Sequence, residues 1–409
     1  MEAGEATIRS LAKDEAYFFK NNLGSTDIEK QQWLEKRLSE TLLQIDSLSL
    51  EDHISSYLKG RALNVGNSYS EKAESILVDA AKMNPTMFEL WNELGDCIWK
   101  KGDKKGARNC FERALSQQKN KVSLRNLSIV MRHKVGLTKE EIEETVQISK
   151  EAVSLDVSDG TSWYILGNAY LAQFFLCGQA SNVLKCSLNA YTKASDDEKV
   201  LSDPDYYYNK AIVSKYLDDY RNAISYFTEA LSIDPRFSDC QKELEGLKDQ
   251  IVKTHGLVVN KGKLKAKKVG VLMKNLKEKS CSQNPTTQVT MVPFNDLENG
   301  PNKDKAINCV LVSSVVPVGQ TPFVCICLDT QYTCFAVNIY NIDTGKAPKL
   351  GDILTIPFPQ RSTVDMVLGS EEYTFNMLRV DSPLQLMVNN RQLSNDVLAP
   401  LKLTTTAMT

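Results

Sequence analysis

Residues 88–121 read FELWNELGDCIWKKGDKKGARNCFERALSQQKNK, and this stretch decides the fold of the first half of the chain. Its apolar residues recur at the three- and four-residue spacings of a helix, first on one side of a Lys-Gly-Asp turn and then on the other. Two sets mark the two helical faces: Trp91, Leu94, Gly95 and Ile98, then Ala107, Phe111 and Ala114. The small Gly95 and Ala107 allow the two helices to cross closely. Trp91 and Phe111 fill the space on either side.

The same pattern recurs along the chain, and its 34-residue length is typical of the tetratricopeptide repeat. Further copies occupy residues 60–85, 123–152, 163–194 and 207–235, the second of these being degenerate. An insertion around Gly178–Ser181 delays the second helix of the copy that opens at Trp163. Five copies exceed the roughly three needed to bury a continuous core, so we predict an α-solenoid.

The flanks of the repeats differ in character. Residues 1–52 carry helical periodicity and predict an N-terminal cap, and residues 53–255 contain the repeats with a capping helix over 238–253. Residues 256–285 are rich in lysine and predict a linker, which leaves 286–409 as the last domain. The fold class expected is therefore α + β and multidomain, a tetratricopeptide solenoid followed by a small OB-type β-barrel.

The barrel is predicted from five strand-like runs separated by Gly, Pro and Asp turns. They read INCVLVSSVV, FVCICLDT, YTCFAVNIY, GDILTIPF and EYTFNMLRV, and LQLMVNN is a possible sixth strand. From residue 286 onward eight Lys/Arg face eleven Asp/Glu, a net charge of −3. Tyr332 and Tyr340 are candidates for stacking on bases, but this charge favours protein contact or a structural role over nucleic acid.

Composition argues against an enzyme. The three histidines His53, His133 and His255 stand in no catalytic or zinc-binding spacing, and no phosphate-cradling glycine loop is present in the sequence. No cofactor and no metal are expected. Cys325 and Cys327 fall on one face of a predicted strand and are expected to pack in its core. The acidic N-terminus and the lack of a long apolar run predict a soluble intracellular protein without membrane contact.

In stacked helix pairs the first helices line the concave surface, so periodicity names the positions that face it. We call these positions the predicted groove set: Asn92, Asp96, Trp99, Arg132, Tyr164, Asn168, Asp205, Tyr208 and Asp239. The asparagine amides can form hydrogen bonds with a peptide backbone, and Arg132 can pair with a carboxylate. Asp205 and Asp239 can pair with a basic side chain. The alternative is that these are ordinary solvated positions, or packing residues in the case of Trp99 and Tyr208.

Residues 261–268 read KGKLKAKK, with five lysines in eight positions. Lys261, Lys263, Lys265 and Lys267 alternate, so in an extended backbone they would project to one side and meet a row of phosphates. A helix would scatter them. The alternative interpretation is a solvated linker or a nuclear-import patch.

The chain resembles the family of tetratricopeptide proteins with a C-terminal OB domain known as Strap, or tetratricopeptide repeat protein five. The resemblance rests on RALNV, ELWNELGDCIWKKGD, NKVSLRNLSIVMR, DGTSWYILGNAYL, Asp203–Pro204–Asp205 and KGKLKAKK. It implies a non-enzymatic adaptor that recognises the Met-Arg-start peptide of nascent tubulin on the ribosome and promotes tubulin mRNA decay through a recruited decay adaptor. The expected localisation is cytoplasmic.

The resemblance also implies roles for single residues. Arg132 matches a peptide-contact arginine of the family and Asp205 a peptide-contact acid, while Asp239 stands where the family carries Glu. Lys265 and Lys267 match lysines that the family uses against the ribosome, where ribosomal RNA is the partner. The same family is described as a nuclear transcription coactivator that scaffolds histone acetyltransferases, and this role stays open as the alternative, with nuclear localisation.

Overall fold

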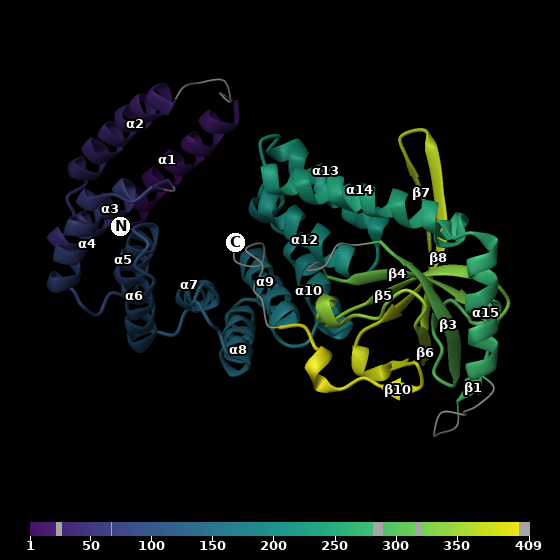
Figure 1. Ribbon diagram of the computed structural model, residues 1–409. Helices are drawn as coiled ribbons and strands as arrows, with labels where there is room; N and C mark the ends of the chain where they lie inside the picture. The colour runs from purple at the N-terminus through teal and green to yellow at the C-terminus, as the bar shows by residue number, and fades with distance from the viewer. Residues whose placement is uncertain (22–26, 67, 281–288, 316–320, 401–409) are drawn as a thin grey trace. The chain divides into compact units, whose positions relative to one another are not determined.

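The computed structural model describes residues 1–21, 27–66, 68–280, 289–315 and 321–400 (Figure 1). The chain divides into two compact units, Met1–Ala169 (unit 1) and Tyr170–Thr409 (unit 2). The division falls inside helix α9 (Gly160–Leu176). Across these described ranges, no helix combines the length and the apolar character that crossing a membrane requires.

Unit 1 is built of helices (Figure 1). Besides the start of α9, they are α1 Glu2–Asn21, α2 Asp27–Ser47, α3 Asp52–Leu63, α4 Glu71–Met83, α5 Phe88–Lys100, α6 Lys104–Gln117, α7 Lys121–Arg132 and α8 Lys139–Leu155. Helix α3 packs on α4, α5 on α6 and α7 on α8, so the first three predicted repeats are confirmed as helix pairs.

The α5–α6 pair shows why the sequence pattern works. A Cβ built on Gly95 would lie 2.6 Å from Cε1 of Phe111, so only glycine lets the two helices approach this closely. Asp103 begins α6 by accepting a hydrogen bond from the backbone N–H of Gly106 at 2.9 Å. The turn residues therefore fix where the second helix starts, and the small residue fixes how tightly it packs.

The N-terminal helices share one core with the first two repeats. Ile8 and Leu11 of α1 and Ile45 of α2 are buried together with Leu58 of α3 and Leu77 of α4. Helix α1 packs on both α2 and α3. The helices predicted within residues 1–52 are therefore confirmed over Glu2–Asn21 and Asp27–Ser47, and they pack on the first repeats.

Unit 2 continues with helices and ends in the β-barrel. Its helices after α9 are α10 Ser181–Ala194, α11 Glu198–Leu201, α12 Pro204–Tyr216, α13 Tyr220–Ile233, α14 Ser238–Val259 and α15 Ala266–Ser280, with a short 3₁₀ turn η1 at Lys261–Lys263. Helix α12 packs on α13, and α13 on α14. The repeat predicted at 207–235 is confirmed, and the capping helix runs six residues beyond its predicted end at 253.

The sheet contains all the predicted strands and four that the sequence pattern missed, three of them only two residues long. Its strands are β1 Thr290–Met291, β2 Gly300–Pro301, β3 Lys305–Ser314, β4 Phe323–Asp329, β5 Cys334–Ile339, β6 Ile353–Pro357, β7 Gln360–Leu368, β8 Glu371–Val380, β9 Met387–Val388 and β10 Arg391–Gln392. Their order is β10-β9-β6-β3-β4-β5-β8-β7-β2, with β1 beside β3. Strand β7 was missed because its first four residues are Gln-Arg-Ser-Thr and the strand has no continuous apolar run.

The barrel closes because β6 and β7 follow one another almost without interruption. Only Phe358, at φ 51°, and Pro359 separate them. Strand β6 pairs with β3, and β7 pairs with β8, which is parallel to β5. The path β3-β4-β5-β8-β7/β6 therefore returns to β3, which is the five-strand closure of an OB barrel.

The barrel interior is apolar and contains the cysteines. Cys309, Cys325 and Cys327 are buried among residues such as Phe294 and Phe335, and the sulfurs of Cys325 and Cys327 lie 4.0 Å apart. The predicted core-packing role of Cys325 and Cys327 is confirmed. Tyr340 is also fully buried, so the expectation that it is available for base stacking is wrong.

The barrel is joined to the helices of unit 2 through a buried cluster of Asp218, Arg379, Tyr340 and Asn338, here called the barrel joint. Asp218, in the α12–α13 turn, accepts hydrogen bonds from Arg379 at 2.8 Å, from Tyr340 at 2.6 Å and from Asn338 at 2.8 Å. The Asp218 and Arg379 side chains are 5% and 3% exposed. Helix α14 also packs on β8 and β5. The barrel thus forms one compact unit with the last repeat.

Candidate functional site

Asn92 of α5 ties two successive first helices together. Its Oδ1 accepts a hydrogen bond from the Ser123 hydroxyl of α7 at 2.6 Å, and its Nδ2 donates to Asn120 at 3.3 Å. The side chain is buried. The expectation that Asn92 presents an exposed amide is therefore wrong, because the amide is used between neighbouring repeats.

Arg132 is the last residue of α7 and is fully buried. Its Nη1 donates to the backbone carbonyl of Ile165 on α9 at 3.2 Å, within unit 1. A guanidinium stays charged when buried, so its hydrogen-bond acceptors have to compensate for lost hydration. The expected exposed fork is wrong: Arg132 lies inside the contact between α7 and α9.

Tyr164 and Asn168 lie on α9 in the same unit. Tyr164 is 8% exposed and Asn168 2% exposed, so neither stands free in solvent. The helix is apolar along most of its length, from Ile165 to Leu176. Exposed groove positions were expected here, and that expectation is wrong because both side chains are buried.

An open cavity of about 560 Å³ lies beside Arg132 in unit 1. It is lined by Asp96, Trp99, Lys100, Gly102, Lys104 and His133. Two of these, Asp96 and Trp99, belong to the predicted groove set, and Trp99 meets the His133 ring edge-on at 4.8 Å. Burial lowers the pKa of His133, so the imidazole stays neutral at physiological pH. His133 escaped the periodicity argument because it follows the last residue of its helix.

Asp205 lies at the N-terminus of α12, in unit 2. Asp203 caps this helix by accepting a hydrogen bond from the backbone N–H of Asp205 at 2.9 Å. Burial, and then the charge of Asp234, raise the pKa of Asp205. Burial, and then the charge of Asp205, raise the pKa of Asp203 to about 6. We call Asp203, Asp205 and Asp234 the acidic cluster.

No ion pair formed by the described residues involves a member of the acidic cluster. Asp203 and Asp205 are partly buried, so repulsion between them is less screened than at an open surface. A bound cation would relieve this repulsion and lower both pKa values.

Tyr208 and Asp239 differ in their surroundings. Tyr208 is 3% exposed and packs between Phe227, at 5.8 Å, and Phe237, at 4.9 Å between ring centroids. The packing alternative is therefore confirmed for Tyr208. Asp239, in the first turn of α14, is exposed and lies 3.2 Å from the ammonium of Lys242. The convergence of Arg132 with Asp205 and Asp239 on one trough, which would span both units, stays a prediction.

The lysine run does not adopt the predicted extended backbone or form a loose linker. Lys261–Lys263 form the turn η1, here called the lysine turn, and Lys267 lies in α15, which packs on β3. All four predicted lysines, Lys261, Lys263, Lys265 and Lys267, are exposed. They do not form a single alternating row, because Val269, Leu272, Met273 and Leu276 give the following segment an apolar helical face that docks on the barrel.

Comparisons with known proteins agree with this architecture. The family model for the tetratricopeptide repeat protein 5 OB fold domain matches residues 288–402, and a tetratricopeptide repeat model matches 88–121 and 204–237. Tetratricopeptide repeat protein 5 of Homo sapiens is 34% identical over 381 residues, covering 88% of this chain and 86% of its own length. The Mus musculus protein is 34% identical over 382 residues with the same shares. The repeats and these relatives support a protein-binding adaptor role, and the chain belongs to the tetratricopeptide repeat protein 5 family.

Proposed function

We propose that this chain recognises the N-terminal Met-Arg-start peptide of nascent tubulin on the ribosome and promotes decay of tubulin mRNA. The family relationship and the helix-pair repeats support an adaptor that binds an extended peptide. In this proposal a decay adaptor is the recruited partner, and the protein works in the cytoplasm, where tubulin is translated.

The observation that carries the proposal is the acidic cluster at the start of α12. Asp203 and Asp205 have raised pKa values because they are partly buried and repel neighbouring carboxylates. A guanidinium supplies the missing positive charge and donates to two carboxylates at once. The arginine of a Met-Arg-start peptide has this chemistry. Exposed Asp239 is the second acid that we assign to the basic part of the peptide.

Arg132 has a different part in the proposal. Its guanidinium is held by the Ile165 carbonyl inside the α7–α9 contact, so it positions the α9 residues Tyr164 and Asn168. A carboxylate of the peptide reaches Arg132 only when the covering side chains move. Neutralising Arg132 therefore changes both the shape of the site and its charge.

Peptide affinity tests the acidic cluster. We expect Asp205→Asn to weaken binding of a Met-Arg-start peptide at least about tenfold, since a charge-assisted hydrogen bond in such a site contributes about 1.5–3 kcal/mol. Asp196→Asn, at an exposed acid of the same unit, is the matched control and should bind normally. Equal affinity of Asp205→Asn and wild type in calorimetric titrations would remove the cluster from the proposal.

Recovery on translating ribosomes tests the whole function. Wild type should co-sediment with ribosomes that carry nascent tubulin, and Arg132→Ala should be depleted from that fraction. Lys265→Glu with Lys267→Glu should weaken ribosome recovery while leaving binding of the isolated peptide in place. Nuclear enrichment, with partners that bind independently of translation, would instead support the alternative coactivator scaffold.

A further inference from the structure

Tyr332 is an exposed aromatic side chain held on a rigid turn of the barrel. It lies between β4 and β5, is 44% exposed, and has a left-handed backbone at φ 64°. The fully buried Asp329 carboxylate fixes this turn by accepting hydrogen bonds from the backbone N–H groups of Phe294, Gln331 and Thr333 at 2.8–2.9 Å. These hydrogen bonds restrain the backbone of the turn, so the partly exposed Tyr332 ring is held in place.

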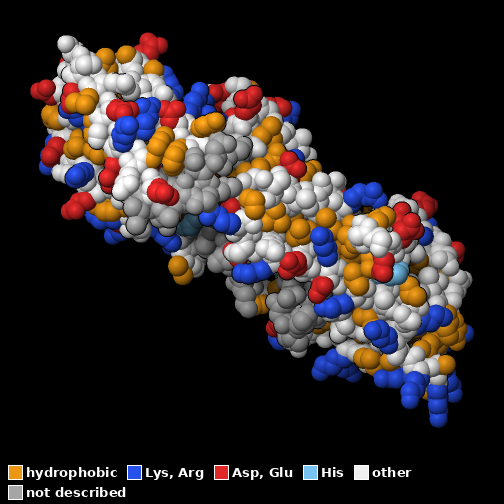
Figure 2. All heavy atoms as spheres, turned by 90° about the horizontal axis from the view of Figure 1, so that it is seen from above, with side chains coloured by type: hydrophobic (Ala, Val, Ile, Leu, Met, Phe, Trp, Pro, Cys, Tyr) orange, Lys and Arg blue, Asp and Glu red, His pale blue; other side chains and the backbone are white. Residues whose placement is uncertain are grey.

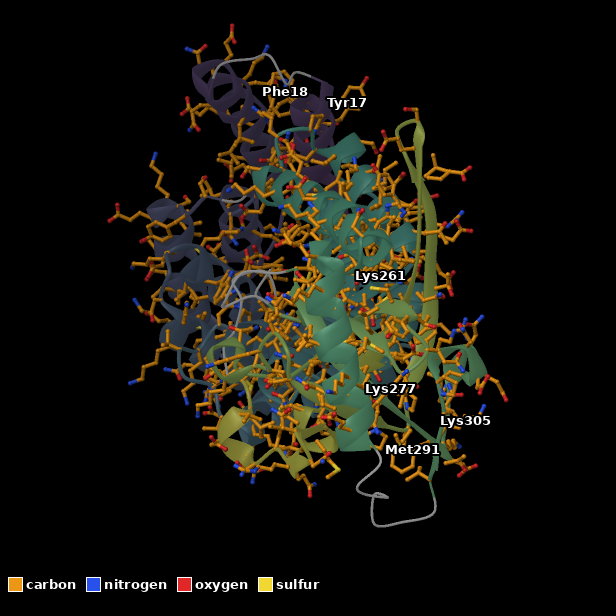
Figure 3. The ribbon with its side chains drawn as sticks, turned by 45° about the vertical axis from the view of Figure 1, so that its right-hand side comes forward. Tyr17, Phe18, Lys261, Lys277, Met291 and Lys305 are labelled. Atoms are coloured by element: carbon orange, nitrogen blue, oxygen red, sulfur yellow. The ribbon has the colours of Figure 1, made fainter. Side chains whose placement is uncertain are left out.

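Two lysines from other elements make cation–π contacts with this ring. The ammonium of Lys261 in the lysine turn lies over the Tyr332 ring at 5.8 Å from its centroid, and that of Lys277 in α15 lies over it at 5.7 Å. Figure 3 labels both lysines beside α15. Neither is close to Tyr332 in sequence, so the barrel fold itself creates this arrangement.

The lysine turn is a strained structure that the barrel holds in place. Lys261, Gly262 and Lys263 all have positive φ, at 46°, 71° and 57°. For a residue other than glycine this conformation is unfavourable, because Cβ comes too close to the following carbonyl oxygen. A Cβ on Gly262 would lie 2.9 Å from the Val312 carbonyl of β3, so the turn sits directly against the sheet. Strain of this kind persists only where surrounding contacts determine the backbone.

The segment that supplies these two lysines is basic. Five further lysines between residues 261 and 280 are exposed: Lys263, Lys265, Lys267, Lys268 and Lys274. Among the described residues of this segment the one acid is Glu278, which lies 3.8 Å from Lys274. Figure 2 shows Lys and Arg side chains gathered at the right-hand end of unit 2, where Figure 1 draws α15. An exposed aromatic within a field of ammonium groups is the combination that binds single-stranded nucleic acid.

We propose that Tyr332, Lys261 and Lys277 form a binding site for one nucleotide of single-stranded RNA. An unpaired base stacks on the Tyr332 ring, and the phosphates on either side of it contact the two ammonium groups. The site deepens the proposed function, on which it rests, by assigning the ribosomal contact to an unpaired RNA segment. It also adds an aromatic residue and two lysines to the pair Lys265 and Lys267.

The experiment is a fluorescence-anisotropy titration of a labelled ten-nucleotide oligouridine RNA with the full-length protein at several salt concentrations. We expect Tyr332→Leu to lower affinity about tenfold, as base stacking on an aromatic contributes about 1–3 kcal/mol. Tyr332→Phe, which keeps the ring and the same backbone, should bind within about twofold of wild type. Tyr17→Leu, at an exposed tyrosine of α1, is a control that should bind normally.

The lysines have a separate signature. Lys261→Gln with Lys277→Gln should reduce the slope of log affinity against log salt by about 1.4, from about 0.7 for each phosphate contact on a single strand. Tyr332→Leu should leave that slope unchanged. On duplex RNA, whose bases are not available for stacking, Tyr332→Leu should match wild type.

Two results would overturn the site: oligouridine affinity that is unaffected by Tyr332→Leu, or an equal loss on duplex RNA. Polyglutamate that binds as tightly as the RNA would point to an acidic protein partner instead and would also overturn it. The peptide titration stays independent of these outcomes. Oligouridine affinity that Tyr332→Leu leaves unchanged, together with a peptide affinity that depends on Asp205, refutes only this inference. A Tyr332-dependent RNA affinity together with a peptide affinity that Asp205→Asn leaves unchanged refutes only the peptide-reading proposal.

Discussion

The two ends of helix α12 carry acidic residues in opposite electrostatic situations. At its C-terminal end Asp218 is buried and fully paired, with Arg379, Tyr340 and Asn338 around it. At its N-terminal end Asp203 and Asp205 are partly buried, and their pKa values are raised by burial and by neighbouring carboxylates. The first arrangement lowers the energy of the folded state, and the second raises it.

This difference separates a structural role from a binding role. A buried acid whose hydrogen bonds are complete joins two parts of a unit and has nothing left for a ligand. A partly buried acid without a cationic partner costs stability until a ligand supplies the charge. Substitutions at the two ends of α12 should therefore change stability and peptide binding differently.

Removing the acid of the barrel joint should have the largest effect. We expect Asp218→Ala to destabilise unit 2 by about 3–5 kcal/mol, because it removes the buried carboxylate that pairs with Arg379, leaving only Asp381, and takes away the acceptor of the Tyr340 hydroxyl. Differential scanning calorimetry checks this, with Asp196→Ala as the control at an exposed acid. An unfolding transition unchanged from wild type would show that Asp218 is not the structural end of α12.

Removing one donor from the same joint should cost less. Tyr340→Phe deletes the hydroxyl that donates to Asp218 at 2.6 Å and leaves Arg379 and Asn338 in place. Burial, and then the Asp218 charge, raise the pKa of Tyr340, so the hydroxyl remains a donor throughout the physiological range. We expect a loss of about 1.5–3 kcal/mol in urea unfolding, the usual contribution of a hydrogen bond to a charged group. A loss as large as that of Asp218→Ala would mean that the packing of the ring was disturbed as well.

At the other end of α12 the expected sign is reversed. Asp203→Asn keeps a good helix cap but removes a charge, so we expect a gain of about 1 kcal/mol at pH 7. The folded-state pKa of Asp203, about 6, lies above its ordinary value of 3.8, so the folded protein binds this proton more tightly. Protonated Asp203 therefore contributes to the free energy of unfolding of the wild type below pH 3.8. This contribution is lost as the pH rises through about 6 and the carboxyl ionises.

The gain from Asp203→Asn should accordingly shrink as pH falls from 7 to 4, which urea unfolding at several pH values measures. The variant should also bind the Met-Arg-start peptide more weakly, since it lacks one of the carboxylates that we propose pair with the peptide arginine. A variant that is more stable but binds the peptide as well as wild type would show that the repulsion within the acidic cluster is not relieved by peptide binding.

Asp239 should give the smallest change in stability. It is exposed and pairs with Lys242 three positions along α14, so Asp239→Asn should shift unfolding by less than about 0.5 kcal/mol. Thermal unfolding at low and high salt should show no difference from wild type beyond this. Any larger loss would indicate that Asp239 has a structural contact in the folded protein.

Much of the solenoid was predictable because each repeat is a local pattern. Trp91, Gly95 and Phe111 are spaced within one helix pair, and their contacts need no information from elsewhere in the chain. The positions assigned to the groove were less predictable. Periodicity places Asn92 and Arg132 on the correct helices, but contacts with the following repeats bury both side chains.

The barrel shows the same limit more clearly. Strands β3 to β6 and β8 were visible as apolar runs, whereas β7 was missed because it has no continuous apolar run. The joint between Asp218 and Arg379 links residues 161 positions apart, and no local spacing indicates it. Charge counting from residue 286 onward gives an acidic barrel, and the preference for protein contact that it indicates stays a prediction.

The sequence by itself determined the helix pairs, most of the strands, and the presence of a lysine-rich segment, because these depend on spacing along the chain. Which charged side chains are buried, and which lie in contact, depends on the tertiary structure. It buries Arg132, completes the hydrogen bonds of Asp218, leaves the acidic cluster unneutralised, and brings Lys261 and Lys277 to Tyr332. The physical reason is that electrostatic interactions depend on distance and burial in space, and neither quantity is set by separation along the chain.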